Sequence, residues 1–220
     1  MTLKIHEGDP AGRPYRRAIE YFPYGPYLNS RQMFVSDQTI ESWAARYGTP
    51  RKWAHQQVVS PEDYAVISGS QKHGRRHDIT LYIEGDGKIA VIAKPFYPPG
   101  LYRAPSGGLE PEESLEAGAT REALEETGLR IQLRDHLLAT AVIFECSGKP
   151  DIEWHSLVFS ATTQDRILSP TDHHEIREAR WATPDEFTVF GAIMRRSQRG
   201  GLLYRAALHE QVAQIHPAFL

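Results

Sequence analysis

The chain has 220 residues, of which 40% are hydrophobic and 24% are charged, and these are ordinary values for a globular protein. This composition excludes collagen-like and wholly disordered chains. The 25 lysines and arginines stand against 28 aspartates and glutamates, so the formal net charge is −3. This charge gives no general attraction to nucleic acid or to an anionic membrane, and we expect neither as a partner. No stretch approaches the roughly 18 consecutive apolar residues that a membrane-spanning helix needs.

The single cysteine, Cys146, excludes a disulfide within the chain and fits a reducing compartment. The first ten residues, MTLKIHEGDP, lack the apolar segment of a secretory signal. We therefore expect a cytoplasmic protein.

Residues 1–75 are predicted to form an N-terminal extension that is rich in aromatic residues and short helices. Residues 21–27 carry four aromatic side chains between two prolines and a glycine, a run that resists regular structure. Helices are expected from Asp37 and from Ser60, which has a proline directly after it. The basic segment 71–77 is either a solvated loop or an attractor of a substrate phosphate. The extension is expected to cover the core, to mediate dimerisation or to line a substrate pocket.

From about residue 76 the pattern changes to that of strands, and the core is predicted to span 76–190. Strands flank the hairpin signature Gly85-Asp-Gly87, a helix over 114–127 ends at Gly128, and a C-terminal helix within 191–220 packs on the core. A mixed sheet interleaved with helices predicts an α/β or α+β layered fold. The strands are expected at 79–84, 88–94, 129–133, 137–146, 152–162 and 175–182.

The helix over 114–127 places acidic side chains on its apolar side. At about 100° per residue, Glu122 and Glu126 fall on the face of Leu115 and Ala119. A solvated helix would instead place its acids opposite the apolar stripe. Carboxylates that converge away from water must be paired or must bind a cation, and Arg121 can offset only part of their charge. The surplus favours Mg²⁺ or Mn²⁺, while an ordinary acidic helix is the alternative.

The residue spacing in this region matches a known motif. The segment reads Gly107, five residues, Glu113, seven residues and then Arg121-Glu-Ala-Leu-Glu-Glu-Thr-Gly-Leu129. It resembles the box of the Nudix hydrolase superfamily, G-x5-E-x7-R-E-U-x-E-E-x-G-U, in which U is an apolar residue. The resemblance extends over about residues 78–187 and implies a Nudix-type α/β/α sandwich with a mixed sheet.

The resemblance also implies an activity. Nudix hydrolases cleave a pyrophosphate bond in a nucleoside diphosphate linked to another moiety, such as a nucleotide or nucleotide sugar, by attack of water on phosphorus. Divalent ions, Mg²⁺ or Mn²⁺, neutralise the developing charge in this chemistry and lower the pKa of a bound water. A small-molecule nucleoside diphosphate derivative is therefore the expected partner. A homodimer is predicted only because two-fold dimers are the commonest oligomers.

The resemblance assigns roles to residues of the box. It implies that Glu122, Glu125 and Glu126 are metal ligands, and that the carbonyl of Ser106 or Gly107 is a further ligand. Either Glu125 or Glu126 would act on the attacking water. Support of the loop and helix is expected from four further residues, which are Glu113, Arg121, Gly108 and Gly128.

Many family members use a further acid from outside the box as a base or extra ligand. We favour Glu175, which precedes the predicted strand that leads to Trp181, as this catalytic residue. A solvated acid at the edge of a strand is the alternative. The other candidates are Glu145, Glu153, Asp172 and Glu178.

Two other functions stay open. The chain could be a catalytically silent Nudix-fold module that binds nucleotides or regulates a partner, although the complete box argues against this. An isopentenyl diphosphate isomerase is disfavoured because no cysteine precedes the box. None of the substrate signatures that flank the box in other members is found, so the nucleoside diphosphate derivative is not identified.

Overall fold

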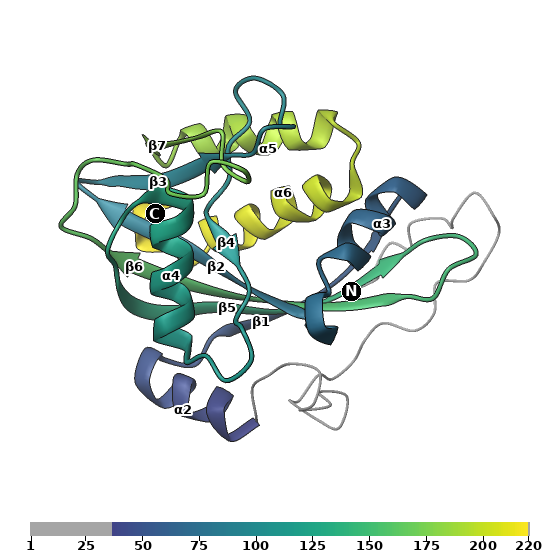
Figure 1. Ribbon diagram of the computed structural model, residues 1–220, viewed down its shortest axis with the longest axis horizontal. Helices are drawn as coiled ribbons and strands as arrows, with labels where there is room; N and C mark the ends of the chain where they lie inside the picture. Colours follow the sequence, from purple (N-terminus) through teal and green to yellow (C-terminus); the bar gives the residue numbers. More distant parts are fainter. Residues whose placement is uncertain (1–36, 220) are drawn as a thin grey trace, which may run out of the picture.

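The structure is a computed structural model that describes residues 37–219 (Figure 1). The aromatic run at 21–27 therefore lies outside the described residues. The helices are α2 (Asp37–Tyr47), α3 (Pro61–Gly69), α4 (Leu115–Thr127), α5 (Glu186–Arg196) and α6 (Gly200–Ala213), with short 3-10 helices η1 (Lys72–Gly74) and η2 (Pro217–Phe219). The strands are β1 (Arg51–Val58), β2 (His77–Gly85), β3 (Lys88–Ala93), β4 (Ser106–Gly107), β5 (Gln132–Glu145), β6 (Ile152–Thr162) and β7 (Glu178–Ala182).

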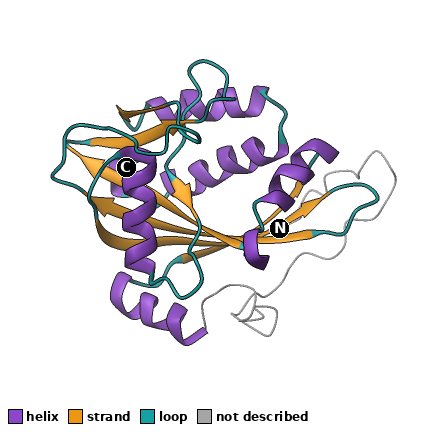
Figure 2. Ribbon diagram, viewed as in Figure 1, coloured by secondary structure: helices purple, strands orange, loops and turns teal. Residues whose placement is uncertain are grey.

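The strands form one mixed sheet in the order β1-β5-β6-β2-β3-β7, and β4 pairs with β2. The pairs β1/β5 and β2/β6 are parallel, while β2/β3, β3/β7 and β5/β6 are antiparallel. Helices lie on both faces of the sheet (Figure 2). The predicted α/β fold with a mixed sheet is therefore confirmed.

The alternation of side chains along β2 explains why the sheet has a core on each face. Ile79, Leu81 and Ile83 pack with α2 and α4 in one cluster. Tyr82, which points to the other face, packs with α5 and α6 in a second cluster. Because successive side chains of a strand point to opposite faces, one apolar strand holds both helical layers.

The predicted hairpin is confirmed between β2 and β3. Asp86 and Gly87 have φ angles of 51° and 70°, and a type I′ turn requires this left-handed conformation at both central residues. The helix after Ser60 is also confirmed, since the Ser60 side chain accepts a hydrogen bond from the Asp63 amide.

Two expectations about the strands were wrong, and one strand was missed. The two strands expected at 129–133 and 137–146 are one strand, β5, in which irregular pairing near His136 interrupts the register without ending the strand. The last strand begins at Glu178 rather than at residue 175. Strand β1 was not predicted, because RKWAHQQV has little apolar alternation. It becomes a strand by pairing in parallel with β5.

Strand β1 lies within the predicted extension, yet it forms one edge of the same sheet as the strands of the predicted core. The divisions near residues 75 and 190 remain predictions. Among the described residues, no helix combines the length and the apolar character that crossing a membrane requires.

A buried histidine gives the fold a dependence on pH. His136 on β5 is 3% exposed, and its ring stacks on Phe159 with the centroids 4.3 Å apart. Neither ring nitrogen has a hydrogen-bond partner among the described residues. Burial lowers the pKa of His136 from 6.5 to about 4, because the apolar surroundings disfavour the charged ring.

We predict that His136→Phe makes the protein less sensitive to acid. Because the folded-state pKa is depressed, the unfolded chain binds the proton first as the pH falls below about 6.5. This single group should therefore lower the free energy of unfolding by about 2 kcal/mol between pH 7 and pH 5. Urea unfolding of both proteins at the two pH values measures the effect. Equal losses in the two proteins would contradict the prediction.

Candidate active site

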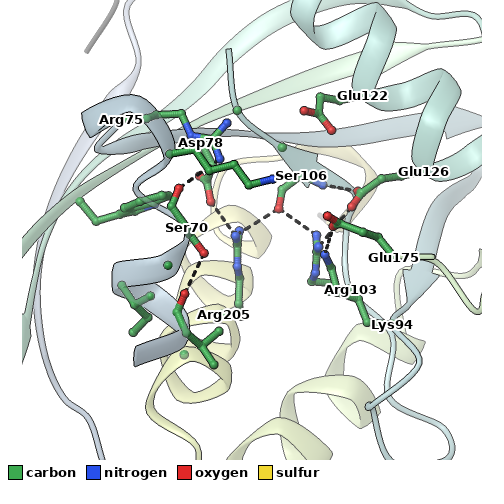
Figure 3. A pocket seen from close by; sticks show the side chains of 18 of the residues that line it. Ser70, Arg75, Asp78, Lys94, Arg103, Ser106, Glu122, Glu126, Glu175 and Arg205 are labelled. Atoms are coloured by element: carbon green, nitrogen blue, oxygen red, sulfur yellow. Dashed lines mark hydrogen bonds and ion pairs between the residues drawn. The ribbon is translucent and has the colours of Figure 1, made fainter. Parts of the chain in front are cut away.

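A pocket of about 620 Å³ lies where several distant segments meet. Its walls come from α3 and η1, from β4 and the loop after it, from α4, and from the start of α6. Figure 3 shows Glu122 and Glu126 of α4 on one side of this pocket, with Arg103 next to Glu126 and with Arg75 and Arg205 farther across. Because α3 and η1 precede residue 75, the predicted extension contributes to the pocket wall.

The ends of α4 fix which of its faces meets the pocket. The Ser114 side chain caps the first turn by accepting a hydrogen bond from the Ala117 amide at 3.2 Å. At the other end Gly128 has a φ of 79° and closes the helix with a bond to the Leu124 carbonyl. A Cβ at Gly128 would overlap the Ser169 carbonyl. Glycine is therefore required there both for the positive φ angle and for the lack of space.

Glu126 is the most deeply buried acid of the helix, with 4% of its surface exposed. One carboxylate oxygen accepts a hydrogen bond from the Ser106 amide at 2.7 Å, and the other lies 3.4 Å from Arg103 Nη2. Burial raises the pKa of Glu126, and the nearby positive charge of Arg103 opposes this shift. The carboxylate is thus fixed beside the backbone of β4.

Glu122 lies one turn earlier on the same face. Burial, together with the negative charges of Glu126 and Glu125, raises the pKa of Glu122 to about 7, although a hydrogen bond from Arg121 opposes this. A Cβ at Gly107 would overlap the Glu122 carboxylate. The glycine therefore allows this carboxylate to lie directly against the backbone.

Arg121 connects the predicted support residues to the acids. Its guanidinium donates to both oxygens of Glu113 at 2.9 Å, and to the Gly108 carbonyl at 2.8 Å. It also bonds to Glu122 at 2.8 Å and Glu125 at 3.0 Å. The structure thus places Glu113, Arg121 and Gly108 together at the loop, as a supporting role requires.

Glu125 and Glu175 lie nearer to the solvent than the other two acids. The Glu125 side chain is 43% exposed, and the Glu175 side chain is 56% exposed. Lys94 bonds to Glu175 at 2.7 Å and holds the pKa of that carboxyl below its usual value. Both acids line the pocket, and Glu175 lies near Glu126 in Figure 3.

The other acids considered for the role of Glu175 divide into two groups. Asp172 lines the pocket, whereas Glu145, Glu153 and Glu178 do not. Glu153 is paired with Arg76 at 3.4 Å, and Glu178 accepts a hydrogen bond from Tyr102 at 2.8 Å.

The carboxylate oxygens that α4 places in the pocket suit a hard cation as ligands. Among the described side chains, no three acids, histidines or cysteines stand close enough together to form a metal-binding group. The fit instead rests on chemistry. Glu122 and Glu126 offer oxygen ligands, and burial raises the pKa of both carboxyls, so a bound cation would stabilise their charged forms. The side chain of Glu122 also reaches the Gly107 backbone, where a carbonyl ligand is expected.

Sequence reasoning missed two arginines that hold the loop from the other side. The Ser106 hydroxyl accepts hydrogen bonds from Arg103 at 2.8 Å and from Arg205 on α6 at 3.1 Å. Arg205 is in turn bound to Asp78 at 2.6 Å. Arg103 had a weak signal, as a charge within the apolar segment 101–104. Arg205 had none, because its partners are more than 95 residues away in the chain.

The sequence of the chain is similar to those of known proteins. A family model described as the NUDIX domain matches residues 73–203. An RNA pyrophosphohydrolase of Wolbachia sp. subsp. Brugia malayi (strain TRS) is 28% identical over 137 residues, covering 56% of this chain and 81% of that protein.

Solved structures show lower similarity. A NUDIX hydrolase from Nitrosomonas europaea is 24% identical with a TM-score of 0.42, and the match covers 64% of this chain and 92% of the other. A crystal structure of a NUDIX hydrolase from the same organism gives 24% identity and a TM-score of 0.40. That match covers 50% of this chain and 58% of the other, so this chain spans less than two thirds of its length. The family model covers more than half of the present sequence, and on that ground the chain belongs to the NUDIX family.

Proposed function

We propose that the chain is a pyrophosphohydrolase that cleaves a nucleoside diphosphate linked to another moiety, with divalent metal ions as cofactors. The observation that carries this proposal is the convergence of Glu122 and Glu126 on the backbone of Ser106 and Gly107. Two like charges held out of water beside a backbone that can offer a carbonyl suit an oxygen-ligated ion. We assign Mg²⁺ or Mn²⁺ on this chemistry.

The residues divide into ligands, supports and groups that act on water. When bound, the metal ions supply a Lewis acid for the phosphate and an acidified water. Glu126 is held by Ser106 and Arg103, so we assign it as a ligand together with Glu122. Glu125 and Glu175 line the pocket and are the more solvent-exposed acids. We assign to one of them the orientation or deprotonation of the attacking water.

The positive groups around the pocket support an anionic substrate. Three of these groups form ion pairs with carboxylates that line the pocket, namely Lys94, Arg103 and Arg205. They offset much of the negative charge that would otherwise repel a phosphate. The cytoplasmic location, the homodimer and the absence of nucleic-acid and membrane partners remain predictions from the sequence and, for the homodimer, from the frequency of two-fold dimers. The substrate panel must include RNA, because a relative is named RNA pyrophosphohydrolase.

The first test is turnover of a panel of nucleoside diphosphate derivatives. We expect release of nucleoside monophosphate with Mg²⁺ or Mn²⁺, and loss of this release with a chelator. Glu126→Gln should lower kcat by at least about 100-fold, because it removes a charged ligand. Phosphorus NMR or chromatography of the products measures the release.

Two results would count against the proposal. Binding of a nucleotide without any turnover across the panel would favour the catalytically silent module. Turnover that survives Glu126→Gln would show that the assigned site is not the reacting one. Glu153→Gln is a matched control, because Glu153 lies outside the pocket and should keep the activity.

We also predict that Gly107→Ala separates activity from stability. The added methyl group must displace the Glu122 carboxylate, a change at the end of a side chain rather than in the backbone. Activity should therefore fall by about 10-fold or more, while the free energy of unfolding changes by about 1 kcal/mol or less. Steady-state kinetics and thermal melting give the two values. Full activity in Gly107→Ala would contradict the close approach of Glu122 to the loop.

A further inference from the structure

The pocket contains two positive side chains that differ from the rest. Among the described residues, seven lysines and arginines line it, and five of them have a carboxylate partner, namely Lys94, Arg103, Arg121, Arg199 and Arg205. Lys72 and Arg75 line the same pocket without an ion pair to any described side chain. Both lie in or beside η1, in the basic segment 71–77.

Arg75 lies directly on the loop of the box. A Cβ at Gly108 would overlap the Arg75 guanidinium. The guanidinium therefore packs directly on the loop backbone, where glycine has no side chain. Nη2 donates to the Ser70 carbonyl at 3.3 Å, which is a long bond. Nε is buried and has no hydrogen-bond partner among the described residues. Because no carboxylate among the described residues pairs with Arg75, its positive charge is available to an anionic group of a ligand in the pocket.

The loop brings Arg75 next to the acidic cluster. Glu126 binds the amide of Ser106, Glu122 lies on Gly107, and Arg75 lies on Gly108. Glu122 and Arg75 therefore lie against neighbouring residues of the loop, and both line the pocket. A pyrophosphate likewise has two adjacent anionic groups, one of which can meet the metal site while the other meets the arginine.

We propose that Arg75, assisted by Lys72, binds the phosphoryl group adjacent to the one held at the glutamates. This subsite rests on the proposed function, and it deepens that function by assigning the second phosphate to residues outside the box. A planar guanidinium matches two phosphate oxygens in a bidentate manner, and Lys72 adds a mobile point charge at the pocket wall. The protein therefore selects ligands with at least two linked phosphates over a single phosphate.

A structural role for Arg75 is the competing explanation. Figure 3 shows Asp78 beside Arg75, and one oxygen of Asp78 is buried without a hydrogen-bond partner among the described residues. The other oxygen is bound by Arg205. If Arg75 served only to neutralise Asp78, its removal would lower the stability of the fold and leave the affinity for phosphates unchanged.

The test measures binding rather than turnover. The probe is methylenediphosphonate, a diphosphate analogue that cannot be hydrolysed, titrated into the full chain with Mg²⁺ by calorimetry. Arg75→Ala should raise the Kd by about 10-fold or more, and Arg75→Lys by a smaller factor. For inorganic phosphate, the Kd of Arg75→Ala should differ from that of the unchanged protein by less than about threefold, because this probe lacks a second phosphoryl group. Arg76→Ala is the matched control, since Arg76 is paired with Glu153, lies outside the pocket and should leave the Kd unchanged.

The outcomes separate the subsite from the activity. An unchanged Kd in folded Arg75→Ala overturns the subsite, whatever the enzyme hydrolyses. If Arg75→Ala melts at a lower temperature, Arg75→Gln repeats the titration with a side chain of similar length that lacks the charge. An Arg75-dependent Kd in a protein that turns over no nucleoside diphosphate derivative supports the subsite and rejects the proposed function.

Discussion

The central constraint on this structure is that one helix must carry acidic side chains into the protein interior. Glu126 is almost fully buried, and Glu122 lies beside it. Two carboxylates in such surroundings repel each other and lose hydration, so each must have hydrogen bonds and positive charge nearby. The Ser106 amide, Arg103 and Arg121 supply these for the two acids.

The rest of the site follows from that constraint. Glu122 reaches the loop backbone only because glycine stands at position 107, and Gly128 ends α4 in a left-handed conformation. Arg103 and Arg205 then hold the loop from the opposite side through the Ser106 hydroxyl. The acidic face, the bare loop and the buried arginines therefore form one electrostatic unit, assembled from β4, α4 and α6.

The features that depend on nearby residues, such as the inward face of α4 and the β2–β3 hairpin, could be predicted from the sequence. The features that depend on pairing between distant segments could not. The spacing of the acids and apolar residues fixes the inward face of α4, and glycines mark the hairpin and the end of the helix. Strand β1 could not be read, because its pattern becomes a strand only by pairing with β5. Arg75 stood in a flagged basic segment, but nothing in the sequence distinguished it from Arg76, which points to Glu153 instead. Contacts between segments decided both cases.

The bonds from Arg205 to Asp78 and to the Ser106 hydroxyl affect the order in which the pocket forms during synthesis. The box is complete by residue 129, but Ser106 and Asp78 receive a partner from a helix that begins at Gly200. During synthesis the charge of Asp78, which is 5% exposed, is therefore balanced by Arg205 only after more than 70 residues beyond the box have been made. The order of synthesis thus leaves this wall of the pocket incomplete until α6 has been made.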